Sequence, residues 1–175
     1  MLQAAQMEAR LEENPEEFDA FVAEYRTRAF RFLLQMVGNY EDALDLLQEG
    51  WVRLYKNWDR RDPDRPFAPW MYRILRNVAI DHLRKRKRQR IYELDLAPDG
   101  QEAAGVVRVS MELRVRLWRA INDLPEEQKE AVVLREMHGL SYAEIADVTG
   151  DSVTAITMRL HHARQRLREQ LRGCF

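Results

Sequence analysis

Apolar residues recur along most of the chain at spacings of three, four and seven residues, which is the period of an α-helix. The first run ends at Gly38-Asn39, a pair that predicts a helix end followed by the N-cap of a second helix. The apolar stripe of the first predicted helix consists of Phe18, Phe21, Val22, Tyr25, Ala29, Phe32, Leu33, Met36 and Val37.

The next two predicted helices flank a segment rich in proline. In the helix that follows Asn39, the apolar stripe is Leu44, Leu47, Trp51, Leu54 and Trp58, and the polar side is Asp45, Gln48, Glu49, Val52, Arg53 and Lys56. Residues 59–69 hold three prolines and are predicted to form a loop. A third helix is expected from Trp70 to about Arg88, with Trp70, Ile74, Leu75, Val78 and Leu83 on its apolar side.

Residues 91–110 are acidic, contain the turn sequence Ala97-Pro98-Asp99-Gly100 and lack a sustained apolar stripe. We therefore expect an all-α fold of two small helical domains, residues 1–90 and 111–175, joined by a flexible linker over residues 91–110. The second domain is expected to begin near Met111, with a helix from Pro125 to Gly139. Its first apolar stripe is Leu113, Leu117, Ala120, Ile121 and Leu124.

The last third of the chain matches the pattern of a helix-turn-helix. Ser141 and Glu144 have the spacing of a capping box, Gly150 ends the short helix, and a longer helix runs to about Arg172. At 100° per residue the longer helix turns inward Val153, Ile156, Leu160, Ala163, Leu167 and Leu171. The opposite side carries Thr154, Met158, His161, His162 and Gln165, flanked by Thr157, Arg159, Arg164, Arg166 and Arg168. These side chains are candidates for DNA contact in the major groove, the alternative being an ordinary helical hairpin with a solvated arginine face.

The net charge of −1 conceals a strong segregation of charge. Residues 51–90 hold 13 basic and 4 acidic residues, whereas residues 1–50 hold 4 basic and 11 acidic residues. Segregated charge favours one surface for a polyanion and another for a different partner. The single cysteine, Cys174, excludes a disulfide framework and favours a cytoplasmic setting. The N-terminus lacks the pattern of an export signal and no apolar run is long enough to span a membrane, so membrane insertion is not expected.

The helix after the proline-rich segment has features suited to single-stranded DNA. Residues 84–90 place six cations in seven positions, and Arg73, Asn77, Asp81 and Arg84 recur on one exposed side. Phe67 and Trp70 supply aromatic rings, and a base stacked on such a ring contributes roughly 1–3 kcal/mol. Trp70 fits a core position equally well, so Phe67, on the looser backbone, is the better candidate for base contact.

Three stretches in order now indicate a family: DALDLLQEGWVRLYKNW, FAPWMYRILRNVAIDHLRKRKR and, after the linker, LPEEQKEAVVLREMHGLSYAEIADVTG. The chain from about Phe18 to Leu171 resembles bacterial RNA polymerase sigma factors of the extracytoplasmic-function (ECF) group of the sigma-70 family. The resemblance implies a transcription initiation factor that binds core RNA polymerase and promoter DNA, melts the −10 element and recognises the −35 duplex. It also implies an anti-sigma protein as a regulatory partner.

The resemblance assigns roles to residues of this chain. Those implied to bind the clamp helices of the polymerase are Asp45, Leu46, Gln48, Glu49 and Arg53. Those implied to bind the −10 element, with a flipped base held by the loop from Arg61 to Phe67, are Arg61, Phe67, Trp70, Arg73, Asn77, Asp81, Arg84 and Arg86. Those implied to bind the −35 element are Ser152, Thr154, Thr157, Met158, Arg159, His161, His162 and Gln165.

The last helix departs from the family pattern at two positions. Thr157 and His162 stand where the family usually has cations. The logarithm of the duplex-binding constant falls linearly with the logarithm of the salt concentration, and each lost phosphate contact makes this slope shallower by nearly one unit. Duplex binding by this protein should therefore weaken less as the salt concentration rises.

Catalysis is not indicated. His82, His138, His161, His162 and one terminal cysteine form no triad spacing, no HExxH and no glycine-rich phosphate loop, so no cofactor or metal is expected. The alternative function is a stand-alone helix-turn-helix regulator, which would dimerise and bind intact duplex by itself. Run-off transcription with purified core enzyme distinguishes the two.

Overall fold

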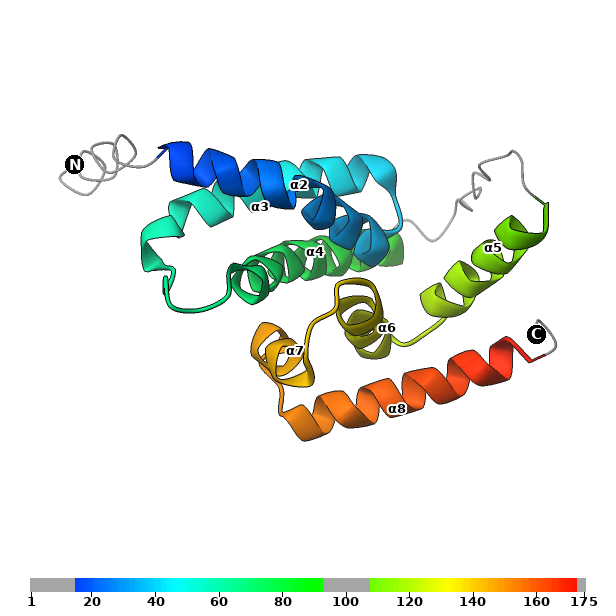
Figure 1. The fold of residues 1–175 in the computed structure, drawn as a ribbon. Helices are drawn as coiled ribbons and strands as arrows, with labels where there is room; N and C mark the ends of the chain where they lie inside the picture. Colours follow the sequence, from blue (N-terminus) through cyan, green and yellow to red (C-terminus); the bar gives the residue numbers. More distant parts are fainter. Residues whose placement is uncertain (1–14, 93–107, 173–175) are drawn as a thin grey trace. The chain divides into compact units, whose positions relative to one another are not determined.

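The computed structural model describes residues 15–92 and 108–172, and in these ranges the chain forms helices and turns with no strand (Figure 1). The predicted all-α class is confirmed. The chain divides into two compact units, residues 1–79 and 80–175, and the division falls inside one long helix. Most of the predicted linker lies outside the described residues.

The first unit is built from α2 (Pro15–Val37), α3 (Tyr40–Lys56), a 3-10 turn (Trp58–Arg60) and the N-terminal part of α4 (Phe67–Tyr92). The predicted break between the first two helices is confirmed. Gly38 has a φ of +73°, which a residue without a Cβ adopts readily, and it ends α2. The side chain of Asn39 then caps α3 by accepting a hydrogen bond from the backbone N–H of Asp42 at 3.0 Å.

The core of this unit lies among α2, α3 and α4 (Figure 1). The rings of Phe32 on α2 and Tyr72 on α4 meet edge to face at 5.1 Å. From α3 the buried residues are Ala43, Leu46, Leu47, Gly50 and Leu54. This stripe has the regular spacing of a buried helix face and passes through Gly50.

Two predictions for α3 are wrong, that for Leu44 from periodicity and that for Leu46 from the family resemblance. Leu44 was expected in the core but is 39% exposed, and Leu46, expected on the partner-binding side, is 5% exposed. The physical reason is that the buried stripe includes a glycine, which carries no apolar side chain and therefore does not register in a hydrophobicity pattern. Gly50 is buried, and Leu75 of α4 occupies the space that a Cβ at this position would need.

Gly50→Val is expected to lower the free energy of unfolding by about 1–3 kcal/mol, because a Cβ at this position overlaps Cδ2 of the fully buried Leu75. Urea denaturation followed by tryptophan fluorescence measures the change. The control is Gln48→Val, on the exposed side of the same helix, which should change stability by less than about 0.5 kcal/mol. Valine has a higher helix propensity than glycine, so a loss in Gly50→Val reports packing, and a loss no larger than that of Gln48→Val would mean that Leu75 accommodates the added side chain.

The predicted loop over residues 59–69 is shorter in the structure, because α4 begins at Phe67. Pro69 falls in the first turn of α4, where its missing N–H has no intrahelical partner to lose. The ring of Phe67 is 7% exposed, so the prediction that it stands on a loose loop is wrong. It belongs to an aromatic cluster formed by Phe18, Phe21, Tyr25, Trp51, Tyr55, Trp58, Phe67 and Trp70.

The second unit contains α5 (Arg108–Asn122), α6 (Glu126–Val132), a π-helical turn (Val133–Met137), α7 (Tyr142–Thr149) and α8 (Val153–Gln170). The helix α5 begins three residues earlier than predicted. Ala120, Ile121 and Leu124 are buried as expected, but Leu117 is exposed, contrary to the prediction. Pro125 precedes α6 as its N-cap, and Gly139, with positive φ, follows the π-helical turn.

The helix-turn-helix is confirmed. The Ser141 hydroxyl accepts from the N–H of Glu144 at 3.2 Å, and the Glu144 carboxylate accepts from the N–H of Ser141 at 2.7 Å. Gly150 adopts the left-handed conformation at φ +81° and ends α7. Ile156, Leu160 and Ala163 anchor α8 in the core, whereas Val153 is exposed although predicted inward. The helical angle sets which side a residue faces, but burial also needs a neighbouring element at the same level along the axis.

Candidate polymerase and nucleic-acid interfaces

The solvent side of α3 combines apolar and acidic side chains. Leu44 and Val52 are 39% and 52% exposed, and Asp45, Gln48 and Glu49 lie exposed beside them. We call these five residues the α3 outer face. Arg53 is half-buried and paired with Glu49 one turn away, an exposed ion pair of small energetic value. Of the residues that the sequence assigned here, only Leu46 is absent from the surface, because its side chain fills the core.

The predicted exposed side of α4 is present in the structure. Arg73, Asn77, Asp81 and Arg84 are all exposed and recur at spacings of three and four. The basic run from Arg84 to Arg88 is exposed as well, and the side chains of Gln89 and Arg90 lie outside the described part. The arginines and the amide on this side present the chemistry that a nucleic-acid backbone and an unpaired base require, and the carboxylate of Asp81 stands among them.

Arg61 contacts protein, whereas the sequence assigned it to DNA. Its guanidinium lies over the ring of Trp58 at 4.8 Å and over that of Phe21 at 5.4 Å, and its Nη2 is 3.4 Å from the carboxylate of Glu17. Its side chain is 14% exposed. This cation–π contact holds the start of the loop against the aromatic cluster and keeps the guanidinium from reaching outward.

Trp70 is neither fully buried nor fully exposed, so both positions left open for it remain compatible with the structure. Its ring is half-buried, with ring centroids 5.6 Å from Phe67 and 6.2 Å from Trp58. One part of the ring therefore belongs to the aromatic cluster, and the remainder faces solvent at the start of α4. Phe67 packs against the ring of Trp70 and is itself only 7% exposed, so it offers almost no surface to solvent.

The outer side of α8 is exposed and mostly uncharged. Its members are Thr154, Thr157, Met158, His161, His162 and Gln165. The Thr157 hydroxyl donates to the carbonyl of Val153 at 2.8 Å, and the rings of His161 and His162 lie 5.7 Å apart. Ser152, predicted to contact DNA, is exposed but uses its hydroxyl to cap α8 by accepting from the N–H of Ala155 at 3.1 Å.

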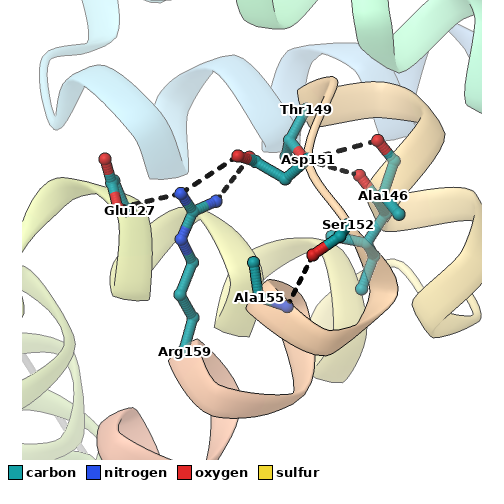
Figure 2. Close-up of polar contacts among 8 residues, drawn as sticks. Glu127, Ala146, Thr149, Asp151, Ser152, Ala155 and Arg159 are labelled. Carbon is teal, nitrogen blue, oxygen red and sulfur yellow. Dashed lines mark hydrogen bonds and ion pairs between the residues drawn. The ribbon is translucent and has the colours of Figure 1, made fainter.

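Arg159 is turned toward the protein (Figure 2). Both terminal nitrogens donate to the carboxylate of Asp151, and Nη2 also forms an ion pair with Glu127 at 3.0 Å. The hydrogen bond to Asp151 raises the pKa of the Arg159 guanidinium above its ordinary value, because it stabilises the charged form. Its side chain is 19% exposed and its guanidinium is engaged within the protein, whereas the family resemblance placed Arg159 among the DNA-binding residues.

Arg164 is held in the same manner farther along α8. Its Nη2 donates to Glu136 at 2.7 Å and its Nη1 to the Tyr142 hydroxyl at 3.2 Å. Both contacts reach residues distant in sequence, and Asp151 is eight residues from Arg159. Because such pairs fall outside the helical i,i+3 and i,i+4 spacings, helical periodicity contains no signal for them.

The described residues contain no group of three or more His, Cys, Asp or Glu side chains able to hold a metal ion. Within the same ranges, no helix has the length and apolarity needed to cross a membrane.

Two family models match the chain one after the other. The model of Sigma-70 region 2 matches residues 21–89, and that of Sigma-70 region 4 matches residues 114–167. The first match covers α3 and most of α2 and α4, and the second ends within α8. The class of protein is therefore that of the sigma-70 initiation factors.

Relatives narrow this class. The ECF RNA polymerase sigma factor SigW of Bacillus subtilis (strain 168) is 34% identical over 161 residues, covering 85% of this chain and 85% of SigW. SigE of Mycolicibacterium smegmatis is 32% identical over 158 residues, covering 88% of this chain and 61% of SigE. The chain belongs to the ECF sigma factors, the transcription initiation factors that bind core RNA polymerase and direct it to promoters.

Solved structures agree with this fold. The sigma factor RpoE of Bartonella quintana, in complex with the anti-sigma factor NepR, matches with a TM-score of 0.79 at 24% identity, over 90% of this chain and 98% of RpoE. CnrH, in complex with the cytosolic domain of CnrY, matches with a TM-score of 0.70 at 26% identity, over 98% of this chain and 96% of CnrH.

Proposed function

We propose that the three interfaces divide the work of initiation among them. Residues 1–90 bind core polymerase and open the −10 element, and residues 111–175 bind the −35 duplex, with residues 91–110 as the connection. The observation that carries this division is that the solvent sides of α3, α4 and α8 differ in chemistry: apolar and acidic on α3, mainly cationic on α4, and largely uncharged with exposed arginines at the margin on α8.

The α3 outer face is the proposed polymerase contact. Two exposed apolar side chains, Leu44 and Val52, surrounded by carboxylates and an amide, have the composition of an interface centre with a polar rim. Asp45, Gln48 and Glu49 would fix the orientation, and Arg53 would hold Glu49 in place. Leu46 supports this face from the core and is not itself a contact.

The exposed side of α4 is the proposed −10 site. Arg73, Arg84 and Arg86 would follow the phosphates, Asn77 and Asp81 would meet base edges near the junction of duplex and single strand, and Trp70 would stack an unpaired base. Each captured base offsets part of the few kcal/mol needed to unpair and unstack it. Strand opening in this scheme draws on binding free energy and needs no nucleotide hydrolysis by this chain.

The outer side of α8 is the proposed −35 site. Thr154, Met158, His161, His162 and Gln165 project from the second helix of the helix-turn-helix, which is the helix that enters the major groove in this motif. The methyl group of Met158 suits contact with thymine methyl groups, and Gln165 suits the edge of adenine. Because Arg159 is engaged with Asp151 and Glu127, this side reads bases with few cations.

We further propose that an anti-sigma protein regulates this factor by covering the α3 outer face. The exposed Leu44 and Val52 suit the apolar side of an amphipathic partner helix. Binding there would exclude polymerase by direct competition. The site of action would be the cytoplasm, where promoter DNA and the polymerase are found.

The test of the proposed function is run-off transcription with purified core polymerase and this protein. We expect site-specific transcripts that are lost when either the −35 or the −10 sequence of the template is scrambled. Transcripts without dependence on the −35 sequence would contradict the role of α8. Binding of the protein alone to a palindromic duplex, with no association with core polymerase, would instead favour a stand-alone regulator.

A further inference from the structure

Arg159 joins three segments of the second unit through one side chain (Figure 2). Glu127 lies in the first turn of α6, Asp151 lies in the turn between α7 and α8, and Arg159 lies in the second turn of α8. The two terminal nitrogens of Arg159 meet both oxygens of Asp151, and Nη2 also lies 3.0 Å from Oε2 of Glu127. A planar guanidinium bound in this forked manner restrains direction as well as distance.

Asp151 is itself held firmly by its backbone. Its N–H donates to the carbonyl of Ala146 at 3.2 Å, and the N–H of Gly150 donates to the same carbonyl at 2.9 Å. The next residue, Ser152, caps α8. The carboxylate that receives Arg159 is therefore anchored to the end of α7, and the arginine connects this anchor to α8 more than one turn beyond the cap.

Such a connection resists rotation of α8 about its own axis. The side chains of a helix end about 5–6 Å from its axis, so a rotation of about 20° moves them by roughly 2 Å. Hydrogen bonds to bases are confined to donor–acceptor distances of about 2.7–3.2 Å. A displacement of that size breaks base contacts made by Thr154 or Gln165, whereas long-range attraction to phosphates changes little.

We propose that Arg159 is a positioning residue for −35 recognition, which sets the rotation of α8 through Asp151 and Glu127 and does not contact DNA. The inference rests on the proposed role of α8 in reading the −35 element. Under this proposal Asp151 favours −35 recognition by holding Arg159, although its own negative charge lies beside the proposed DNA-binding side. A direct phosphate contact by Arg159 would predict the opposite behaviour of Asp151.

The test is a double-mutant cycle of Arg159→Gln and Asp151→Asn in the full-length protein assembled with core polymerase. The readout is the ratio of transcription from a matched −35 template to that from a template with the −35 sequence scrambled. We expect each single variant to lower this ratio about tenfold, the double variant to be no worse than either single variant, and the salt dependence of promoter binding to stay unchanged. Additive losses, or a gain in promoter affinity for Asp151→Asn, would overturn the proposal.

Two further variants separate positioning from charge and from folding. Arg159→Lys keeps the charge but cannot engage both carboxylates as a fork, so it should fail to restore the ratio, whereas a phosphate contact would be largely restored. Arg166→Gln changes an exposed arginine of α8. It should make the slope of log K for promoter binding against log salt concentration shallower by about one, and it should leave the ratio of matched to scrambled transcription unchanged. If Arg159→Gln loses helicity by circular dichroism, Arg159→Lys and Asp151→Asn carry the test.

The outcome for the wild-type protein separates the two levels of inference. If the wild-type holoenzyme does not distinguish matched from scrambled −35 sequences, the proposed role of α8 fails. If it does distinguish them and the Arg159 and Asp151 variants do so equally well, only the positioning role fails.

Discussion

Asp45→Arg is expected to weaken binding to core RNA polymerase by about 100-fold, while leaving the fold intact. Asp45 is exposed on the α3 outer face beside the apolar side chain of Leu44. Placing a cation where the partner is complementary to a carboxylate brings like charges together, which costs several kcal/mol at an interface. Titration of fluorescently labelled protein with purified core enzyme measures the loss.

The matched control is Asp19→Arg, which makes the same change of charge at an exposed position of α2. It should leave polymerase affinity within about twofold of wild type, because an isolated surface charge acts only through a screened field. Val52→Ala, made in the otherwise wild-type protein, removes exposed apolar area from the α3 outer face. It should weaken polymerase binding by about fivefold, which is less than the effect of Asp45→Arg. Equal affinities for Asp45→Arg and Asp19→Arg would remove α3 from the interface.

The combined variant Arg84→Ala with Arg86→Ala is expected to reduce stable open complexes by about 30-fold, with little change in affinity for core polymerase. Both side chains are exposed in the basic run of α4. Removing two cations that contact single-stranded DNA should make the slope of log K for open-complex formation against log salt concentration shallower by about 1.4. Permanganate reactivity of unpaired thymines, measured across a series of salt concentrations, reports the open fraction directly.

The control variant is Arg26→Ala with Arg31→Ala, which removes the same charge from exposed positions of α2. A promoter mismatched over the −10 element supplies a second control, because its strands are already unpaired and the deficit in opening should shrink there. A loss of polymerase affinity with normal opening would mean that the surfaces of α3 and α4 have been interchanged.

Local features of the chain were predictable because their causes lie within four residues of one another. The cap at Asn39, the capping box of Ser141 and Glu144 and the positive φ of Gly150 all follow from short-range hydrogen bonds and steric freedom. The exposed row on α4 also follows from helical periodicity alone. These elements, in their order, were enough to indicate the family and its helix-turn-helix.

Side-chain environments at several candidate sites depended on partners from elsewhere in the chain. Leu46 is in the core because the stripe of α3 runs through Gly50 against Leu75, and Phe67 is buried because rings from α2 and the 3-10 turn surround it. Neither neighbour is visible in the periodicity of the helix concerned. The family resemblance gave Leu46 and Phe67 contact roles, although both side chains are buried in the core.

Periodicity and capping thus determined that the helices form, their order along the chain and the capped starts of α3 and α7, since those properties arise from backbone geometry and near neighbours. Only the folded arrangement decided which polar groups are already engaged. Arg159 has the composition of a DNA contact, yet Asp151 and Glu127 occupy its guanidinium. The physical reason is that an ion pair forms wherever the fold brings opposite charges within reach, and that proximity is a property of three-dimensional packing.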